Sequence, residues 1–254
     1  MREMLPTIEG AAADQNAEFD EAAFVAALTS VNLQRSFEAV QTVLVDGVKL
    51  DSVITTLVLL AADRMANTPV NVDAGWENLT LELNLAASLR SAQQVGGDLV
   101  AAKGVFHVAW QIFADRWINI PSRVLSEPLS EEKLNVANEA EGLKDIIDTI
   151  ETLDVQGVGP KVLGYLNAGY SAERLIEEIG HTVLWDDTGS EVLPTLRTVF
   201  EEWEHAEGHP AQAQLLVGLA RYVTDIRSNT DNKSAATTAM RFSEGRTTVE
   251  VFEE

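Results

Sequence analysis

Apolar residues recur every three or four positions along most of this chain, a spacing that predicts α-helices. The first such run contains Phe24, Ala27 and Leu28, and Asp20 precedes it at a position suited to a helix N-cap. Strand-like alternation is nearly absent outside the tail, where residues 247–252 form either a short strand or an extended segment. Further helices are predicted over residues 37–44, 53–61, 76–95 and 99–119, followed by the helix-ending residues Gly47, Pro69, Gly96-Gly97 and Pro121.

The second part of the chain continues the helical pattern after a surface connection over residues 122–130. Ser130, followed by two glutamates, has the composition of a helix start. Another helix around residues 146–153 precedes Gly157-Val158-Gly159-Pro160, which we interpret as a turn. Together these patterns predict an all-α protein, a single compact bundle of about ten helices.

Two stretches of the chain have similar patterns, which predicts an internal repeat with halves at about residues 20–125 and 131–245. Each half contains a helix that stops at a glycine, an apolar helix, a longer helix and a glycine-containing break. Gly47 and Gly169, the two glycine stops, are 122 residues apart, and apolar positions after them repeat at the same offset. Chance similarity between helical hairpins is the alternative. If the repeat is real, the seam between the halves is the natural place for a pocket.

Composition narrows the class of protein. The chain has 254 residues, 46% of them apolar, which is enough for one large domain with a substantial core. It has no cysteine, so disulfides, thiolate metal sites and cysteine nucleophiles are excluded. Forty acidic against 18 basic residues give a net charge of −22, which repels phosphate backbones, so no nucleic-acid partner is expected. The longest apolar stretch, residues 53–62, is too short to span a bilayer, so no membrane partner is expected either.

The chain start and the choice of basic residues suggest a cellular setting. The first residues carry acids instead of a long apolar run, which argues against a secretory signal and predicts a cytoplasmic location. Only six of the basic residues are lysines, and twelve are arginines. An acidic, lysine-poor surface predicts a halophilic protein adapted to a salty cytoplasm; an ordinary acidic mesophilic protein is the alternative.

Two of the four histidines lie in apolar helices beside a tryptophan. His107 occurs in GVFHVAWQIFADRW, one turn before Trp110, and His181 occurs in LIEEIGHTVLWDD, one turn before Trp185. If the two helices meet across the seam, the imidazoles can act together as metal ligands or acid–base groups. The alternative is that each is a core histidine satisfied by a neighbouring carboxylate or carbonyl.

Other candidate groups give weaker signals. The spacings Glu178 to His181 and Glu202 to His205 place a carboxylate and an imidazole on one helical face, as in carboxylate-bridged di-iron sites. His205 precedes a helix end and fits a solvated last turn better. The acid pair beginning at Asp186 can serve as a general base or ligand, or cap a helix end. No phosphate-loop, dinucleotide, serine-hydrolase or zinc-protease motif is present in the sequence.

Three segments carry a family resemblance: AADRMANTP followed by Trp76, then KGVFHVAWQIFADRWINIPSRVL, and then YLNAG and HTVLWDDTG separated by eleven residues. Together they resemble an all-helical domain of prokaryotic proteins that often follows a Rieske-type iron–sulfur domain, and they are distantly similar to the helical questin oxidase-like proteins. The resemblance covers about residues 30–245. It implies an oxidoreductase-associated domain with a non-haem metal ion (iron, manganese or zinc) as a cofactor. A Rieske centre needs cysteine ligands, so this chain cannot form one itself.

The resemblance also implies a ligand set. Family histidines in the helix after Trp76 and just after the acidic turn correspond here to Glu82 and Glu191. Either these glutamates replace histidine as hard oxygen ligands, or the site is degenerate. The implied metal ligands are His107, His181, Glu82 and Glu191; the implied catalytic groups are His107, His181 and Asp186; Trp110 and Trp185 would wall the pocket.

Two functional hypotheses follow. In the first, the protein is an oxidoreductase-type enzyme or an oxidoreductase-associated subunit with a small-molecule or metal pocket between its halves. In the second, it is a non-catalytic scaffold that has lost the ligand set and binds a protein partner or a second copy of itself. The first predicts that the two histidines converge with a carboxylate and that pKa values there are perturbed. The second predicts separated histidines, a filled seam and an exposed apolar patch that marks a partner surface.

Overall fold

The computed structural model describes residues 17–69, 75–118, 124–127, 129–130, 132, 136–185, 192–227, 240 and 243. This part of the chain is helical and contains no strand, as the sequence predicts. Its helices are α2 (Glu21–Leu28), α3 (Leu33–Val45), α4 (Leu50–Asn67), α5 (Trp76–Gly96), α6 (Asp98–Ala114), the short 3₁₀ helix η1 (Asp115–Ile118), α7 (Glu139–Glu151), α8 (Val155–Asn167), α9 (Ala172–Trp185), α10 (Val192–His205) and α11 (Ala213–Ile226).

Side-chain caps explain where several helices begin. The Asp20 carboxylate accepts a hydrogen bond from the Ala23 amide at 3.0 Å, which confirms the predicted start of α2. Asn138 caps α7 and Asp154 caps α8 in the same way. The tail segment 247–252 lies outside the described residues.

Two local predictions are wrong. Ser130 begins no helix, because α7 starts at Glu139 and the described residues around Ser130 have no regular secondary structure. Residues 157–160 form no turn but belong to the first turns of α8, where Asp154 caps the helix. Proline lacks an N–H and is tolerated only near a helix start or at a cost in the interior, so Pro160 suggested a break. The cap and the packing of α8 outweigh that cost.

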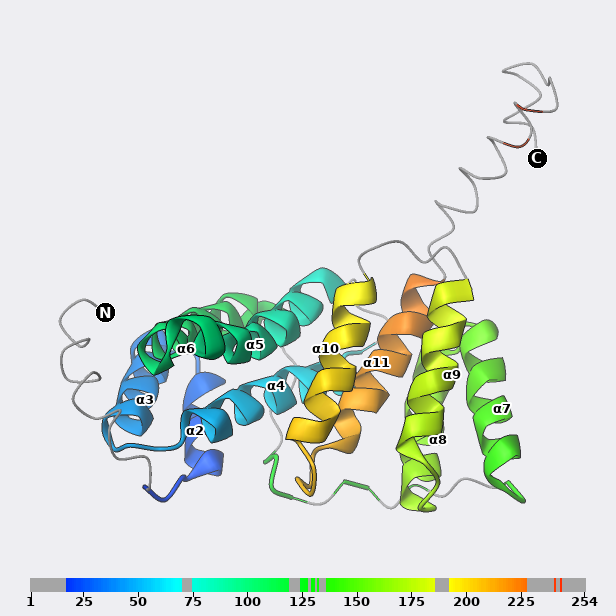
Figure 1. The fold of residues 1–254 in the computed structure, drawn as a ribbon, viewed down its shortest axis with the longest axis horizontal. Coiled ribbons are helices and arrows are strands. Elements are labelled where there is room, and N and C mark those ends of the chain that lie inside the picture. Colours follow the sequence, from blue (N-terminus) through cyan, green and yellow to red (C-terminus); the bar gives the residue numbers. More distant parts are fainter. Residues whose placement is uncertain are drawn as a thin grey trace.

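The helices form one compact bundle with two groups on either side of a central pair (Figure 1). Helices α2, α3, α5 and α6 lie on one side, and α7, α8 and α9 lie on the other. Between them α4 packs directly against α11, and α10 covers α5. Both central helices are buried on nearly all sides, and α11 is buried without interruption from Gln214 to Thr224.

Small residues let the central helices approach closely. A Cβ atom at Gly218 of α11 would lie 2.9 Å from the Met65 Cβ of α4, closer than such atoms pack. A Cβ atom at Gly159 of α8 would lie 3.3 Å from the Arg221 Cδ of α11. Glycine at these two positions therefore brings α4, α11 and α8 into one tight stack.

The two predicted halves of the chain share a packing order. The pairs α2–α3, α3–α6 and α5–α6 all pack together, and so do the pairs α7–α8, α8–α11 and α10–α11. Helix α3 spans 33 to 45 and α8 spans 155 to 167, a shift of 122 residues at both ends. Gly47 and Gly169 follow these helices with φ of 80° and 77°, a left-handed conformation that glycine adopts without strain. These parallels support the internal repeat, which stays a prediction.

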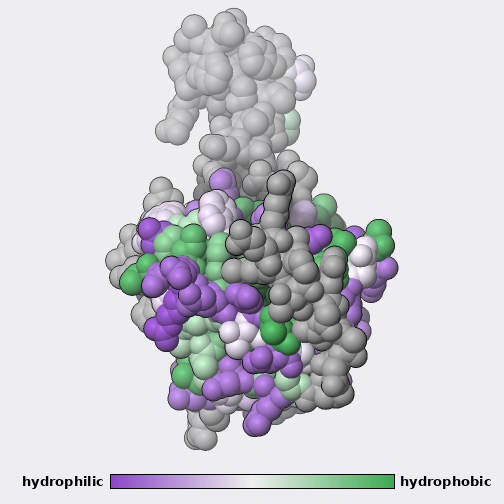
Figure 2. All heavy atoms as spheres, turned by 90° about the vertical axis from the view of Figure 1, so that its left-hand side faces the viewer, coloured by the Kyte–Doolittle hydropathy of each residue, from purple (hydrophilic) through white to green (hydrophobic). Residues whose placement is uncertain are grey.

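Hydrophilic and hydrophobic residues alternate on the described surface at the α2–α3 end of the molecule. Figure 2 shows hydrophilic residues and small hydrophobic patches interspersed there, without one continuous apolar face on the described surface. Among the described helices, none combines the length and the apolar character needed to cross a membrane.

Candidate functional site

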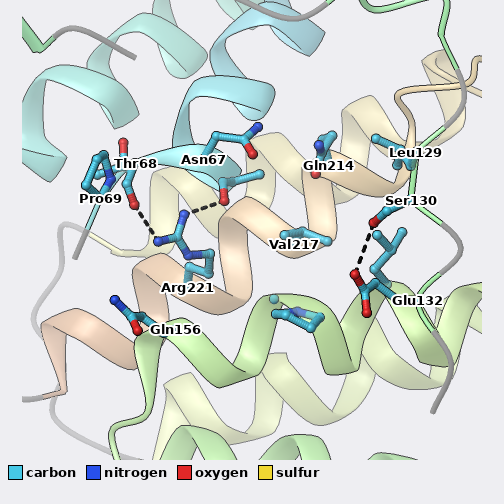
Figure 3. A pocket seen from close by; sticks show the side chains of 14 residues that line it. Asn67, Thr68, Pro69, Leu129, Ser130, Glu132, Gln156, Gln214, Val217 and Arg221 are labelled. Atoms are coloured by element: carbon cyan, nitrogen blue, oxygen red, sulfur yellow. Dashed lines mark hydrogen bonds between the residues drawn. The ribbon is translucent and has the colours of Figure 1, made fainter. Parts of the chain in front are cut away.

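A pocket lies where the C-terminal end of α4 meets α8, α11 and the connecting segment around Ser130 (Figure 3). Its volume is about 520 Å³. Both predicted halves contribute walls, since α4 belongs to the first half and α8 and α11 belong to the second. The lining consists of residues 66–69 from α4 and its end, of Leu129, Ser130 and Glu132, of Gln156, Gly159, Pro160 and Leu163 from α8, and of Gln214, Val217 and Arg221 from α11.

Arg221 forms one wall of this pocket and holds the end of α4. Its Nη1 donates to the backbone carbonyl oxygens of Met65, at 3.0 Å, and Ala66, and its Nη2 donates to that of Thr68. Its Nε donates to the carbonyl oxygen of Val155 at 3.3 Å. The last carbonyls of a helix have no partner within the helix, so Arg221 caps α4 from outside. Burial lowers the pKa of its guanidinium, with an opposing effect from the Asp225 carboxylate.

A second buried polar contact links α11 to α4 beside the pocket. The Gln214 Nε2 donates to the Asp63 Oδ1 at 3.1 Å, and Asp63 is fully buried. The Asn67 Nδ2 donates to the Asp63 carbonyl oxygen at 2.8 Å. Because Gln214 uses its amide nitrogen on Asp63, its amide oxygen remains as an acceptor on the pocket side.

On its other flank α4 carries a buried acidic cluster. The Arg64 Nη1 donates to the Glu82 Oε1, and the Arg64 Nη2 donates to the Asp115 carbonyl oxygen at 3.0 Å. Glu82 is fully buried, and among the described residues no donor reaches its Oε2. Burial raises the pKa of the Glu82 carboxyl to about 7, because it outweighs the opposing effect of Arg64, and the neighbouring Asp115 carboxyl raises that pKa further. The Asp115 Oδ2 itself accepts a hydrogen bond from the Gln111 side chain.

A second buried ion pair joins α5 to α10 and is fully satisfied. The Arg90 Nε and Nη2 donate to the two Glu202 carboxylate oxygens at 2.7 and 2.9 Å. Arg90 also donates to Asp51 and to the Thr55 hydroxyl of α4. This fork-shaped pairing fixes α10 against the first group of helices.

The structure separates the residues implied as metal ligands. His107 on α6 and His181 on α9 are both exposed, whereas Glu82 is fully buried and paired with Arg64. The expected burial of the two histidines is therefore wrong. Among the described residues, no group of three or more histidine, aspartate or glutamate side chains is placed to hold a metal ion. The described members of the implied set do not fit one metal centre.

The other implied site residues divide between exposed positions and undescribed ones. Trp110 is 51% exposed, so it walls no buried pocket. Asp186, Glu191 and the side chain of Trp185 lie outside the described residues, and their roles stay predictions.

Glu202 and His209 have structural partners. Glu202 is held by Arg90, and His205 is exposed at the last position of α10, as predicted for a solvated helix end. The His209 Nε2 lies 3.1 Å from the Glu21 Oε1, so it ties α2 to the turn before α11. Burial raises the pKa of Glu21, but hydrogen bonds from His209 and Thr56 outweigh it and leave that pKa below the ordinary value.

Sequence reasoning missed Arg221 and Gln214, two buried polar residues that α11 contributes to the pocket wall. The available signal was a glutamine and an arginine seven residues apart in the otherwise apolar run AQLLVGLARYV. That spacing places both side chains on one helical face.

Comparisons of the chain with protein-family models, with curated proteins and with solved structures found no match.

Proposed function

We propose that this protein binds a small organic molecule in the pocket at the seam of its two halves. The observation that carries the proposal is the pocket itself, whose volume of about 520 Å³ falls in the range of small-molecule sites. Its lining combines apolar residues, among them Leu163 and Val217, with polar residues that include Gln214 and Arg221. Small-molecule sites likewise combine apolar surface with placed polar groups that fix the orientation of the ligand.

The polar groups in the wall support a binding role. Arg221 and Gln214 are 6% exposed each and are held by hydrogen bonds to α4. Groups fixed in this way keep their geometry when a ligand arrives, which reduces the entropy lost on binding.

The class of reaction comes from the family resemblance. We propose that the bound molecule is a substrate or ligand of an oxidoreductase-type enzyme or of a subunit associated with one. The described lining contains no histidine, so any redox chemistry would need a group that the ligand or a partner brings. Ligand binding therefore comes before redox assays in testing this proposal.

A matched pair of variants tests the pocket. Gln156→Trp places an indole at the pocket mouth from an exposed position in the first turn of α8. Gln34→Trp makes the same change in the first turn of α3, 122 residues earlier and away from the pocket. In ligand-observed NMR with a fragment library, we expect fragments bound by the wild type to lose at least about tenfold in affinity with Gln156→Trp only. Equal binding by all three proteins would contradict the proposal.

Two observations favour the scaffold alternative: His107 and His181 are exposed on different helices, and two tryptophans are exposed. Trp110 on α6 and Trp117 in η1 are 51% and 58% exposed, and aromatic residues of this size are enriched at protein interfaces. A homodimer formed through these side chains would dissociate in the double variant Trp110→Ser/Trp117→Ser. Light scattering over a concentration series checks this, and an unchanged monomer in both proteins argues against self-association.

A further inference from the structure

The charges in the wall of the seam pocket indicate which ligands it prefers. Among the lining side chains that the structure describes, two carry a formal charge, Arg221 and Glu132. Figure 3 shows them at the two ends of the pocket, with Val217 between them. Their availability to a ligand differs because their hydrogen-bond partners differ.

The Arg221 guanidinium already donates most of its hydrogen bonds within the protein. Arg221 has five N–H groups, and four of them donate to backbone carbonyl oxygens of α4, its end and α8. The carbonyls at a helix C-terminus carry partial negative charge, so they balance the guanidinium. An anionic ligand placed beside Arg221 would face the same carbonyls and be repelled by them.

The Glu132 carboxylate, by contrast, has few partners among the described residues and can bind a ligand. Glu132 is exposed, and within the described residues its carboxylate accepts one hydrogen bond, from the Ser130 hydroxyl at 3.3 Å, and forms no ion pair. The net charge of −22 adds a long-range field that concentrates cations near the protein.

Two neutral acceptors add to this preference. Pro160 has no N–H, so the Gln156 carbonyl oxygen four residues earlier loses its α-helical partner at the pocket edge. The Gln214 amide oxygen accepts no hydrogen bond from a described residue. The pocket thus offers acceptors, and a complementary ligand supplies donors.

We infer that the ligand of this pocket is a small organic cation, an apolar body that carries an ammonium group. The ammonium would lie toward Glu132, and the apolar body would pack on Leu163 and Val217. This inference rests on the proposed function, since it names the ligand class of the same site.

Three probes with one apolar body test the charge preference. Benzylammonium, benzyl alcohol and benzoate share a benzyl or phenyl group and differ in charge, and NMR titration gives the affinity of each. We expect benzylammonium to bind up to about fivefold more tightly than the alcohol, with benzoate the weakest, and we expect the difference to shrink in high salt. Glu132→Gln should remove the preference for the cation and leave the affinity for the alcohol unchanged. Glu127→Gln, which removes a charge five residues earlier in the sequence and outside the lining, should preserve the preference.

The outcomes separate the two proposals. Equal affinity for the three probes, or tightest binding of benzoate, overturns the cation preference and leaves the pocket as a binding site. A preference that survives Glu132→Gln also overturns it, because the charge would then act from elsewhere. Binding of no probe, together with no effect of Gln156→Trp on any fragment, overturns both.

Discussion

Two arginines hold the C-terminal end of α4, and they differ in what receives their hydrogen bonds. Arg64, on α4 itself, points to the first group of helices and pairs with the Glu82 carboxyl beside Asp115. Arg221, from α11, reaches across to α4 and donates to three backbone carbonyls there and to one of α8. The first region is closed, whereas the second borders a pocket of about 520 Å³.

The difference shows how one type of side chain produces two kinds of environment. The Arg64 guanidinium donates to one Glu82 oxygen and leaves the other without a donor among the described residues. A proton can stabilise that second oxygen, so the charge of the first region depends on pH. A guanidinium that meets only carbonyls is a fixed structural cap, so the second region keeps its shape while the space beside it stays open. We therefore expect a proton to bind on the first side and a small molecule on the second.

Removing Arg221 should give the largest effect. Arg221→Met keeps the apolar stem but removes the donors that cap the carbonyls at the end of α4, and we expect a loss of roughly 3 kcal/mol or more in the free energy of unfolding. Arg197→Met is the control, since Arg197 is exposed and pairs only with Glu201 on its own helix; we expect a change within about 0.5 kcal/mol. Urea denaturation measures both. A loss below about 1 kcal/mol for Arg221→Met would show that α4 needs no cap from α11.

The raised pKa of Glu82 should make the free energy of unfolding depend on pH. The pKa of Glu82 is about 7 in the folded protein and 4.5 ordinarily, so between these values the folded state binds more protons than the unfolded state. The Glu82 contribution to stability is therefore full below about pH 4.5, and it is lost as pH rises through about 7, by roughly 3 kcal/mol in all.

Glu82→Gln isolates this contribution, because a glutamine resembles the protonated carboxyl and can donate to Asp115. We expect the variant to gain stability relative to the wild type as pH rises from about 4.5 to about 7, and to keep that gain above it. Glu202→Gln is the matched control, since both Glu202 oxygens bind Arg90 and its loss should cost stability without that pH-dependent gain. Parallel pH profiles for wild type and Glu82→Gln would contradict a raised pKa at Glu82.

The stack of α4 and α11 can be tested with two glycines. Gly218→Ala places a methyl group 2.9 Å from the Met65 Cβ and 3.1 Å from the Ala62 carbonyl oxygen, and we expect a loss of about 1–3 kcal/mol. Gly180→Ala on α9 meets only ordinary contacts at 3.8 Å, to Phe200, and should stabilise the protein by up to about 1 kcal/mol through helix propensity. Thermal denaturation compares the two; equal shifts would mean that α4 and α11 do not approach as closely as described.

The sequence was sufficient for the helices and insufficient for the contacts among them. Period, N-caps and glycine stops predicted α2 and α5 closely, because these signals are local. The exposure of His107 could not be predicted from its neighbours, because apolar residues flank it on both sides in sequence. On α6 the buried face comprises Val105, Phe106, Val108, Ala109 and Ile112, and it leaves His107 and Trp110 on the outer face.

The pocket could not be predicted in detail, because its walls depend on tertiary packing. At one repeat position the first half has Phe37, whose ring packs at 5.7 Å from that of Phe106, while the second half has Gly159 beside the cavity. The sequence contains both residues, but only the packing of α8 on α11 shows the consequence. Phe37 fills the space beside its helix, whereas Gly159 leaves room for the pocket. The carbonyls that Arg221 caps are likewise distant in sequence from it.

The most direct test of the account is a proton–nitrogen correlation NMR titration with benzylammonium, read residue by residue. We expect concentration-dependent shifts at Gln156, Gln214 and the end of α4 near Asn67, with the side-chain signals of Arg221 also affected and α6 unchanged. Shifts confined to α6 around His107 and Trp110, or the same shifts in Gln156→Trp, would contradict a ligand site at the seam.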